Sequence, residues 1–296
     1  MRQGGGRVAA AVLAAAMLPL AGCRFTTRKL PKPLAPELVQ TVPPQKLVDG
    51  MDQRWEAMNT LSAKVEIQFT QMKTLEGVAR DYTTFPAYIL IRKPDDLRVL
   101  GQLPVVHTTM FDMVSNGHDF TLYLPTRDQA YQGPNALTHR SPNTIENLRP
   151  GFFLDSLIVR GISAQDEFMV TADTDMVEDP KRKHLLEIPE YILSIMQAMP
   201  NSPERRAIRV IHFHRDDLLP YQQDLYDDQG NLQTEVIYGR YAMYGDNMFP
   251  STVTIKRPLE GFQAVLTVVK VVENLELKND QFQLQIPPDT KVQNLK

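Results

Sequence analysis

The densest group of potential metal ligands in the sequence is the string HFHRDD at positions 212–217. Side chains two residues apart on a β-strand point to the same face of the sheet. His212, His214 and Asp216 would therefore share a face, where two imidazoles and a carboxylate could bind Zn²⁺. One function that this spacing admits is a metal-dependent hydrolase.

The rest of the sequence favours a simpler interpretation of this string. It is similar to the HxHxDH motif of the metallo-β-lactamase superfamily, but Asp217 stands where the motif needs its last histidine. The chain contains no GxSxG nucleophile elbow and no glycine-rich phosphate loop. The remaining histidines lack the spacing of that superfamily; they are His107, His118, His139 and His184. We therefore predict a protein that is not an enzyme, with no metal site and no cofactor, in which 215–217 form the polar end of a hairpin.

The only cysteine, Cys23, closes the tetrapeptide LAGC at 20–23. Two arginines and an apolar run from Val8 to Leu20 precede it, and this run is too short to span a bilayer. One cysteine cannot form an intramolecular disulfide. The tetrapeptide resembles the lipobox of bacterial lipoproteins, which implies a cleaved signal peptide at 1–22 and lipid attachment at Cys23. The alternative is an ordinary secretory leader with an incidental cysteine.

Several acyl chains on one residue hold a protein stably on a membrane, because each buried methylene contributes about 0.8 kcal/mol. Arg24 follows the cysteine. By resemblance to enterobacterial lipoproteins, the lack of aspartate there implies a lipid anchor in the outer membrane, with the protein facing the periplasm. Cleavage removes two arginines and no acids from a chain of net charge −3. The resulting acidic balance disfavours a nucleic-acid partner.

The mature chain divides into a tether at 23–45 and a body at 46–296. Five prolines between Thr26 and Gln45 deny the backbone donors and helical freedom, which is typical of a semi-extended spacer. The whole chain is 43% hydrophobic and has no second linker, so the body is predicted to be one domain.

The apolar residues of the body change from a helical period to a strand period. Spacings of three and four predict a helix over 46–61, and a second helix is predicted over 141–158, interrupted at Pro150. Strict alternation over 62–71 predicts a half-buried strand. Further strands are predicted at 87–92, 97–101, 108–115, 120–124, 183–188, 208–214, 221–226, 233–244, 251–257 and 263–273. Such closely spaced strands favour an antiparallel meander.

This order of elements resembles the lipoprotein carrier and receptor proteins LolA and LolB. The segments that support the resemblance are KPDDLRVLGQLPVV at 93–106, MVSNGHDFTLYLP at 113–125, YGDNMFPSTVTIKRP at 244–258 and ENLELKNDQFQLQIPPDTKV at 273–292. The resemblance implies a mainly β fold with α-helices, an incomplete, half-open antiparallel β-barrel of about eleven strands covered by helices. In this family the hollow receives acyl chains.

A curved sheet closed by helices encloses apolar volume that its own side chains do not completely fill. The candidates for lining this hollow are Trp55, Val65, Ile67, Phe69, Ile89, Ile91, Val99, Met110, Leu122, Phe152 and Phe153. The alternative for each is an ordinary packed core position.

The resemblance also implies a loop that inserts into the membrane, because the receptor member projects an apolar loop between two early strands. Leu103, Pro104 and Val105 lie at the matching place, and the alternative is that the apolar pair folds back onto the core. The carrier member opposes its lid to a buried arginine. Arg92 and Arg98 are the candidates here, although both also fit ordinary outward-facing charges.

Together these features predict a lipid-anchored, monomeric protein that binds acyl chains or lipoproteins and assists their delivery to the outer membrane. Its partners would be the membrane, this cargo and a periplasmic carrier protein that supplies it. The alternative is a structural lipoprotein that scaffolds an envelope assembly and has no cargo.

Overall fold

The computed structural model describes residues 38–73, 78–136, 149–178, 185–199 and 202–295. The chain forms a larger unit of Ala35–Asp175 and Glu187–Lys296 and a smaller unit of Met1–Leu34 and Met176–Leu186. The predicted signal peptide, Cys23 and most of the tether lie outside the described residues. No helix in the described ranges is long and apolar enough to cross a membrane.

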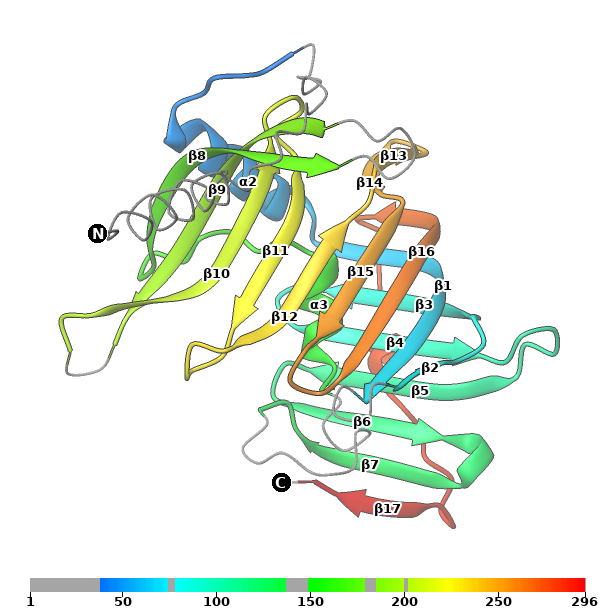
Figure 1. Ribbon diagram of the computed structural model, residues 1–296. Coiled ribbons are helices and arrows are strands. Elements are labelled where there is room, and N and C mark those ends of the chain that lie inside the picture. Colours follow the sequence, from blue (N-terminus) through cyan, green and yellow to red (C-terminus); the bar gives the residue numbers. More distant parts are fainter. Residues whose placement is uncertain (1–37, 74–77, 137–148, 179–184, 200–201, 296) are drawn as a thin grey trace, which may run out of the picture. The chain divides into compact units, whose positions relative to one another are not determined.

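The described residues form one extensive β-sheet (Figure 1). Its fifteen strands are β1 (Thr60–Lys73), β2 (Val78–Asp81), β3 (Phe85–Arg92), β4 (Asp96–Gln102), β5 (Thr109–Asn116), β6 (Asp119–Leu124), β7 (Gln129–Pro134), β8 (Glu167–Glu178), β9 (Leu185–Ala198), β10 (Arg205–His214), β11 (Pro220–Tyr226), β12 (Leu232–Tyr238), β15 (Thr252–Arg257), β16 (Phe262–Glu273) and β17 (Lys291–Asn294). The strand order is β17-β7-β6-β5-β4-β3-β1-β16-β15-β12-β11-β10-β9-β8, with β2 on β1. The two ends of this path do not pair, so the sheet is open.

The expectation of about eleven strands is too low. The unpredicted strands β2, β7 and β17 are short and polar, and β8 is almost entirely exposed, so none shows a one-sided apolar alternation. The predicted strand at 233–244 is two strands, because the chain leaves the main sheet at Gly239. Its second half, β13 (Tyr241–Tyr244), forms a separate two-stranded sheet with β14 (Asn247–Pro250).

The central strands follow the predicted alternation closely. Along β1, Leu61, Ala63, Val65 and Ile67 are buried, and the residues between them are less so. β1 pairs antiparallel with β3 on one side and with β16 on the other, with an irregularity at Lys64/Val65. Most strand pairs with a defined register are antiparallel; β17 pairs with β7 in parallel.

Among the described residues, two α-helices pack against this sheet, and short 3₁₀ turns lie at Pro125–Arg127 and Asn279–Phe282. α2 (Pro44–Ala57) begins with a proline in its first turn, where a missing N–H costs nothing. It ends before the predicted boundary, because Leu61 already belongs to β1. α3 (Gly151–Leu157) starts directly after Pro150, and the first half of the predicted helix, 141–148, lies outside the described residues.

Each helix buries its apolar residues in a different core cluster. Leu47, Val48 and Met51 of α2 pack in a cluster with residues of β9 and β10. Phe152 and Phe153 of α3 belong to the larger cluster of β1, β3, β4, β15 and β16. The positions of both helices are therefore fixed mainly by apolar burial.

Arg92 and Arg98 secure the chain after β16 instead of a lid. Arg92 donates to the Leu277 carbonyl oxygen at 3.2 Å, and Arg98 donates to the Gln281 carbonyl oxygen at 2.9 Å. Arg98 also forms an ion pair with Asp112 at 2.7 Å. Both arginines alternate with buried neighbours on their strands, so they face away from the core, as the alternative interpretation expected.

Candidate functional site

Most residues predicted to line a hollow lie in the main apolar cluster. Trp55 and Phe69 pack against its edge, and the buried members are Val65, Ile67, Ile89, Ile91, Val99, Leu122, Phe152 and Phe153. Much of the inner face of the sheet is therefore filled by its own side chains.

Met110 is the exception among these candidates. Met113 pairs with Val99 across β4 and β5 and is buried in the cluster, and Phe111 packs against it. The register of β4 and β5 shifts between Gly101 and Gln102, which pair with Phe111 and Thr109, so Met110 lies at the irregularity between these pairs. Phe111 and Met113 are the residues of β5 that join the cluster, and the assignment of Met110 to a hollow stays a prediction.

An apolar cavity of about 260 Å³ remains open beside the filled core. Its walls come from α2, from the end of α3 and the residues after it, from the inner face of β10–β12, and from the β13–β14 hairpin. The residues that define it are Met51, Trp55, Leu157, Phe213, Tyr238 and Phe249. Of the predicted lining residues, Trp55 borders this cavity.

A second cavity, of about 360 Å³, has a more polar wall. Arg149, Arg160 and Arg257 face it together with Asp95 and Asp155. Phe152, another predicted lining residue, also borders it.

α3 and the residues that follow it contribute to both cavities. Gly151, Phe152, Leu154 and Asp155 border the polar cavity, and Leu157, Ile158 and Val159 border the apolar cavity. We call this short segment the partition, because it borders both cavities.

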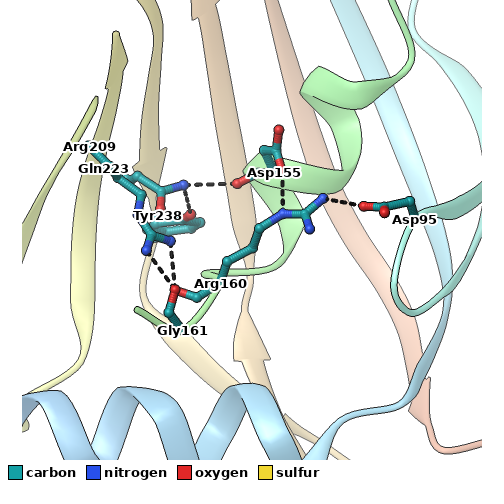
Figure 2. Close-up of polar contacts among 7 residues, drawn as sticks. All are labelled: Asp95, Asp155, Arg160, Gly161, Arg209, Gln223 and Tyr238. Atoms are coloured by element: carbon teal, nitrogen blue, oxygen red, sulfur yellow. Dashed lines mark hydrogen bonds and ion pairs between the residues drawn. The ribbon is translucent and has the colours of Figure 1, made fainter. Parts of the chain in front are cut away.

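A network of polar side chains, which we call the latch, holds this partition in place (Figure 2). Arg209 of β10 donates to the carbonyl oxygens of Arg160, at 2.6 Å, and Gly161, at 2.9 Å. Arg160 in turn bridges Asp155 at 2.7 Å and Asp95 at 2.9 Å. The latch thus ties the segment after α3 to the sheet on both sides.

Gln223 and Tyr238 extend the latch to the backbone of α3 at Asp155 (Figure 2). The Gln223 side-chain amide donates to the Asp155 carbonyl oxygen at 2.8 Å and lies 3.3 Å from the Tyr238 hydroxyl oxygen. Burial raises the pKa of Tyr238 well above its usual value. Its hydroxyl is therefore neutral at physiological pH.

The two latch arginines have different electrostatic surroundings. Burial lowers the pKa of Arg209, which is 8% exposed, and Asp155 only partly offsets this effect. Burial alone would also lower the pKa of Arg160, but its carboxylate partners Asp155 and Asp95 raise it above the usual value. Arg209 is thus a buried cation held mainly by backbone carbonyls, which is a costly arrangement to maintain.

The sequence interpretation did not identify Arg209, although a signal was available. Within the predicted strand 208–214, Arg209 has the same parity as Ile211 and Phe213, which are completely buried. A charged residue at an inward-facing strand position indicates a buried polar contact.

Trp55 lies where the latch meets α2. The Lys93 ammonium lies 4.1 Å from the centre of its ring, and the Arg160 guanidinium lies 5.7 Å from it. A β-carbon on Gly161 would lie 2.8 Å from the Asp52 carboxylate and 3.0 Å from the Trp55 ring. Only glycine therefore allows the segment after α3 to approach α2 so closely.

The β4–β5 loop exposes a different part of the predicted apolar tip. Val105 is 90% exposed and Val106 is 64% exposed, whereas Leu103 and Pro104 are half-buried. Val105 adopts a φ of 71°, which is unfavourable for a β-branched residue. The tip of this loop is therefore Val105–Val106, held outward in a strained conformation.

The histidine string does not assemble a metal site. β10 ends at His214, so Asp216 lies in the following turn, beyond the alternation of the strand. His212 Nδ1 lies 2.8 Å from a Glu190 carboxylate oxygen, which also accepts a hydrogen bond from the Tyr221 hydroxyl at 2.5 Å. Among the residues that the structure describes, no group of three or more His, Cys, Asp or Glu side chains could hold a metal ion.

Comparisons with known proteins bear on the fold. No protein-family model and no curated protein matches the chain. A LolA superfamily protein from Nitrosomonas europaea is similar in structure, with a TM-score of 0.50, 14% identity, and coverage of 82% of this chain and 99% of that one. A DUF1329 family protein from Desulfovibrio piger also has a TM-score of 0.50 and 14% identity, over 80% of this chain and 95% of its own. The open sheet with its two packed helices is therefore a LolA-like fold.

Proposed function

We propose that the protein binds acyl chains, presented by lipids or lipoproteins, in the apolar cavity and assists their delivery to the outer membrane. The observation that carries this proposal is the cavity bounded by α2, the end of α3 and the β13–β14 hairpin, on a LolA-like sheet. Burial of each methylene there would contribute about 0.8 kcal/mol. Transfer to a lipid phase would solvate the chain equally well, so release requires no covalent step.

The size of the cavity indicates how binding would proceed. Its volume of about 260 Å³ lies just below the range of roughly 300–1,000 Å³ for ligand pockets. With α3 in place it would hold only part of a long chain. We expect a long acyl chain to displace α3, open the latch and occupy both cavities, so that the ligand selects the open state.

The route to the membrane is part of the same proposal. The chain would be exported by a leader at 1–22, anchored through Cys23 by a tether at 23–45, and would fold as a body at 46–296. The loop with Leu103, Pro104 and Val105 would touch the lipid together with Val106, which is exposed beside Val105. Two adjacent exposed valines supply apolar contact at the tip of this loop.

Trp55 allows a direct test, because it is the only tryptophan in the chain and borders the apolar cavity. The chain without residues 1–22 and with Cys23→Ser would be titrated with a brominated palmitate, which quenches indole fluorescence on contact. We expect saturable quenching, and none by a brominated short-chain acid at the same concentration. Equal, non-saturating quenching by both acids would refute the acyl site and favour the scaffold.

A further inference from the structure

The β13–β14 hairpin forms a wall of the apolar cavity without belonging to the main sheet. Its two strands pair only with each other in the described sheets. Tyr241 and the segment 246–250 contribute to the cavity wall. From this arrangement we infer that the hairpin is the gate through which an acyl chain enters the cavity, and that α3 is an inner partition. This inference rests on the proposed function.

The hairpin is attached by two neutral side-chain hydrogen bonds and by the packing of Tyr241, Tyr244 and Phe249 on the main apolar cluster. The Tyr244 hydroxyl donates to the Val268 carbonyl oxygen at 3.2 Å, and the Tyr241 hydroxyl donates to the Pro220 carbonyl oxygen at 3.0 Å. Phe249 is the one residue of the hairpin body that reaches the main apolar cluster as a buried member. These two hydrogen bonds are neutral and therefore weaker than the charge-assisted hydrogen bonds that Arg209 donates to the segment after α3.

The base of the hairpin, in contrast, is firmly tied to the sheet. Gly239 donates to the Thr252 carbonyl oxygen at 2.8 Å, and Ser251 donates to the Arg240 carbonyl oxygen at 2.9 Å. A β-carbon on Gly239 would lie 2.1 Å from the Thr252 hydroxyl oxygen, so the two strands cross there at close range. Because the base is fixed and the body is held by weaker contacts, the hairpin can rotate about its base at residues 239 and 252 without disturbing β12 or β15.

The outer surface of the hairpin suits passage of an apolar chain. Met243 and Met248 lie directly opposite each other in the hairpin register and are 63% and 48% exposed. Methionine is flexible and polarizable, so it adapts to apolar partners of varied shape. Met248 also contributes to the cavity wall, so this pair connects the surface to the interior.

The other walls of the cavity are harder to move. Met51 of α2 and Phe213 of β10 belong to one buried cluster, and the strands β10–β12 are each paired on both sides in the sheet. α3 buries five of its seven residues, and Arg209 holds the segment after it through two carbonyl oxygens. Local opening occurs where few buried contacts must break, so the hairpin is the wall of the cavity that can move most easily.

Stopped-flow quenching of Trp55 by brominated palmitate tests the gate. Tyr244→Phe removes one hydroxyl that holds the hairpin and does not border the cavity. We expect the association and dissociation rates to rise together by about fivefold, the factor that corresponds to one typical hydrogen bond. Tyr82→Phe is the matched control, because its hydroxyl bonds to Gln71 and not to the hairpin; its rates should equal those of the parent.

Hydrogen exchange provides an independent measurement if Tyr244→Phe folds poorly. The amides of Met243 and Met248 should exchange faster than those of β15 and β16, and should slow when palmitate is bound. Binding with unchanged rates in Tyr244→Phe, or a hairpin protected as strongly as β15, would overturn the gate while leaving the acyl site intact. Absence of binding in the parent chain would instead refute the proposed function.

Discussion

Replacing Arg209 by methionine tests whether its hydrogen bonds oppose ligand binding or only stabilise the fold. The change removes two hydrogen bonds from a charged donor, at 2.6 and 2.9 Å, each of which contributes about 1.5–3 kcal/mol. Removing a buried cation returns part of this free energy. We therefore expect the free energy of unfolding to fall by about 2 kcal/mol, which lowers the Tm of a domain of this size by about 4–8 °C.

The same substitution should strengthen ligand binding. If a long acyl chain displaces α3, the free energy that holds α3 closed opposes binding, and its loss raises the apparent affinity. A change of 2 kcal/mol corresponds to an increase of up to about 30-fold. The assay is titration of Trp55 fluorescence with brominated palmitate, performed beside thermal unfolding without ligand.

Arg98→Met is the matched control for this prediction. Arg98 also bonds to a backbone carbonyl oxygen and to a carboxylate, but it lies on the opposite face of the sheet from the latch. Its loss should lower the Tm without increasing the affinity. If Arg209→Met lowers the Tm and leaves the affinity unchanged or weaker, α3 is not displaced by the ligand and the reasoning is wrong.

Three further changes test packing, membrane contact and pH dependence. Gly101→Ala would place a β-carbon 2.2 Å from a ring carbon of Phe111 and should lower the free energy of unfolding by about 1–3 kcal/mol in chemical denaturation. Gly50→Ala is the control, because a β-carbon there meets open space and should leave stability unchanged or raise it. Val105→Glu should weaken binding of the lipid-free chain to vesicles without changing the Tm. Val78→Glu is the control, because Val78 is an exposed valine at the start of β2. An equal loss of vesicle binding in both variants would show that the β4–β5 loop makes no specific membrane contact. Burial raises the pKa of Glu273 above 4.5, so the folded state holds this proton more tightly and loses stability as the pH rises above that value. In Glu273→Gln the Tm should decline less between pH 4.5 and 7, and parallel Tm curves for the two proteins would contradict this assignment.

Local sequence patterns predicted the central strands well, because one face of each is buried and the other is wet. The alternation through Val65 and Ile67 in β1 required no knowledge of their partners. Short edge strands such as β17 gave no such pattern, because all of their residues are exposed and their pairing depends on a distant strand. The number of strands was therefore underestimated at the edges of the sheet.

The functional site was less predictable, because its contacts join segments that are far apart in the sequence. The buried position of Arg209 follows from alternation, but its acceptors at Arg160 and Gly161 depend on where the chain after α3 crosses the sheet. The register shift opposite Met110 was equally invisible, because a β-bulge depends on the pairing with the neighbouring strand. To predict the cavity wall formed by the β13–β14 hairpin, one would have to recognise that the strand breaks at Gly239. The strand-like pattern continues across this glycine and gives no sign of the break.

Native mass spectrometry tests the central claim most directly. The chain without residues 1–22 and with Cys23→Ser would be exported to a bacterial periplasm behind an unrelated leader, purified without detergent, and measured before and after delipidation. The account predicts a reproducible adduct with the mass of an acyl-bearing molecule, which disappears on delipidation and returns with added palmitate. A bare chain in both spectra that also refuses palmitate would contradict acyl binding.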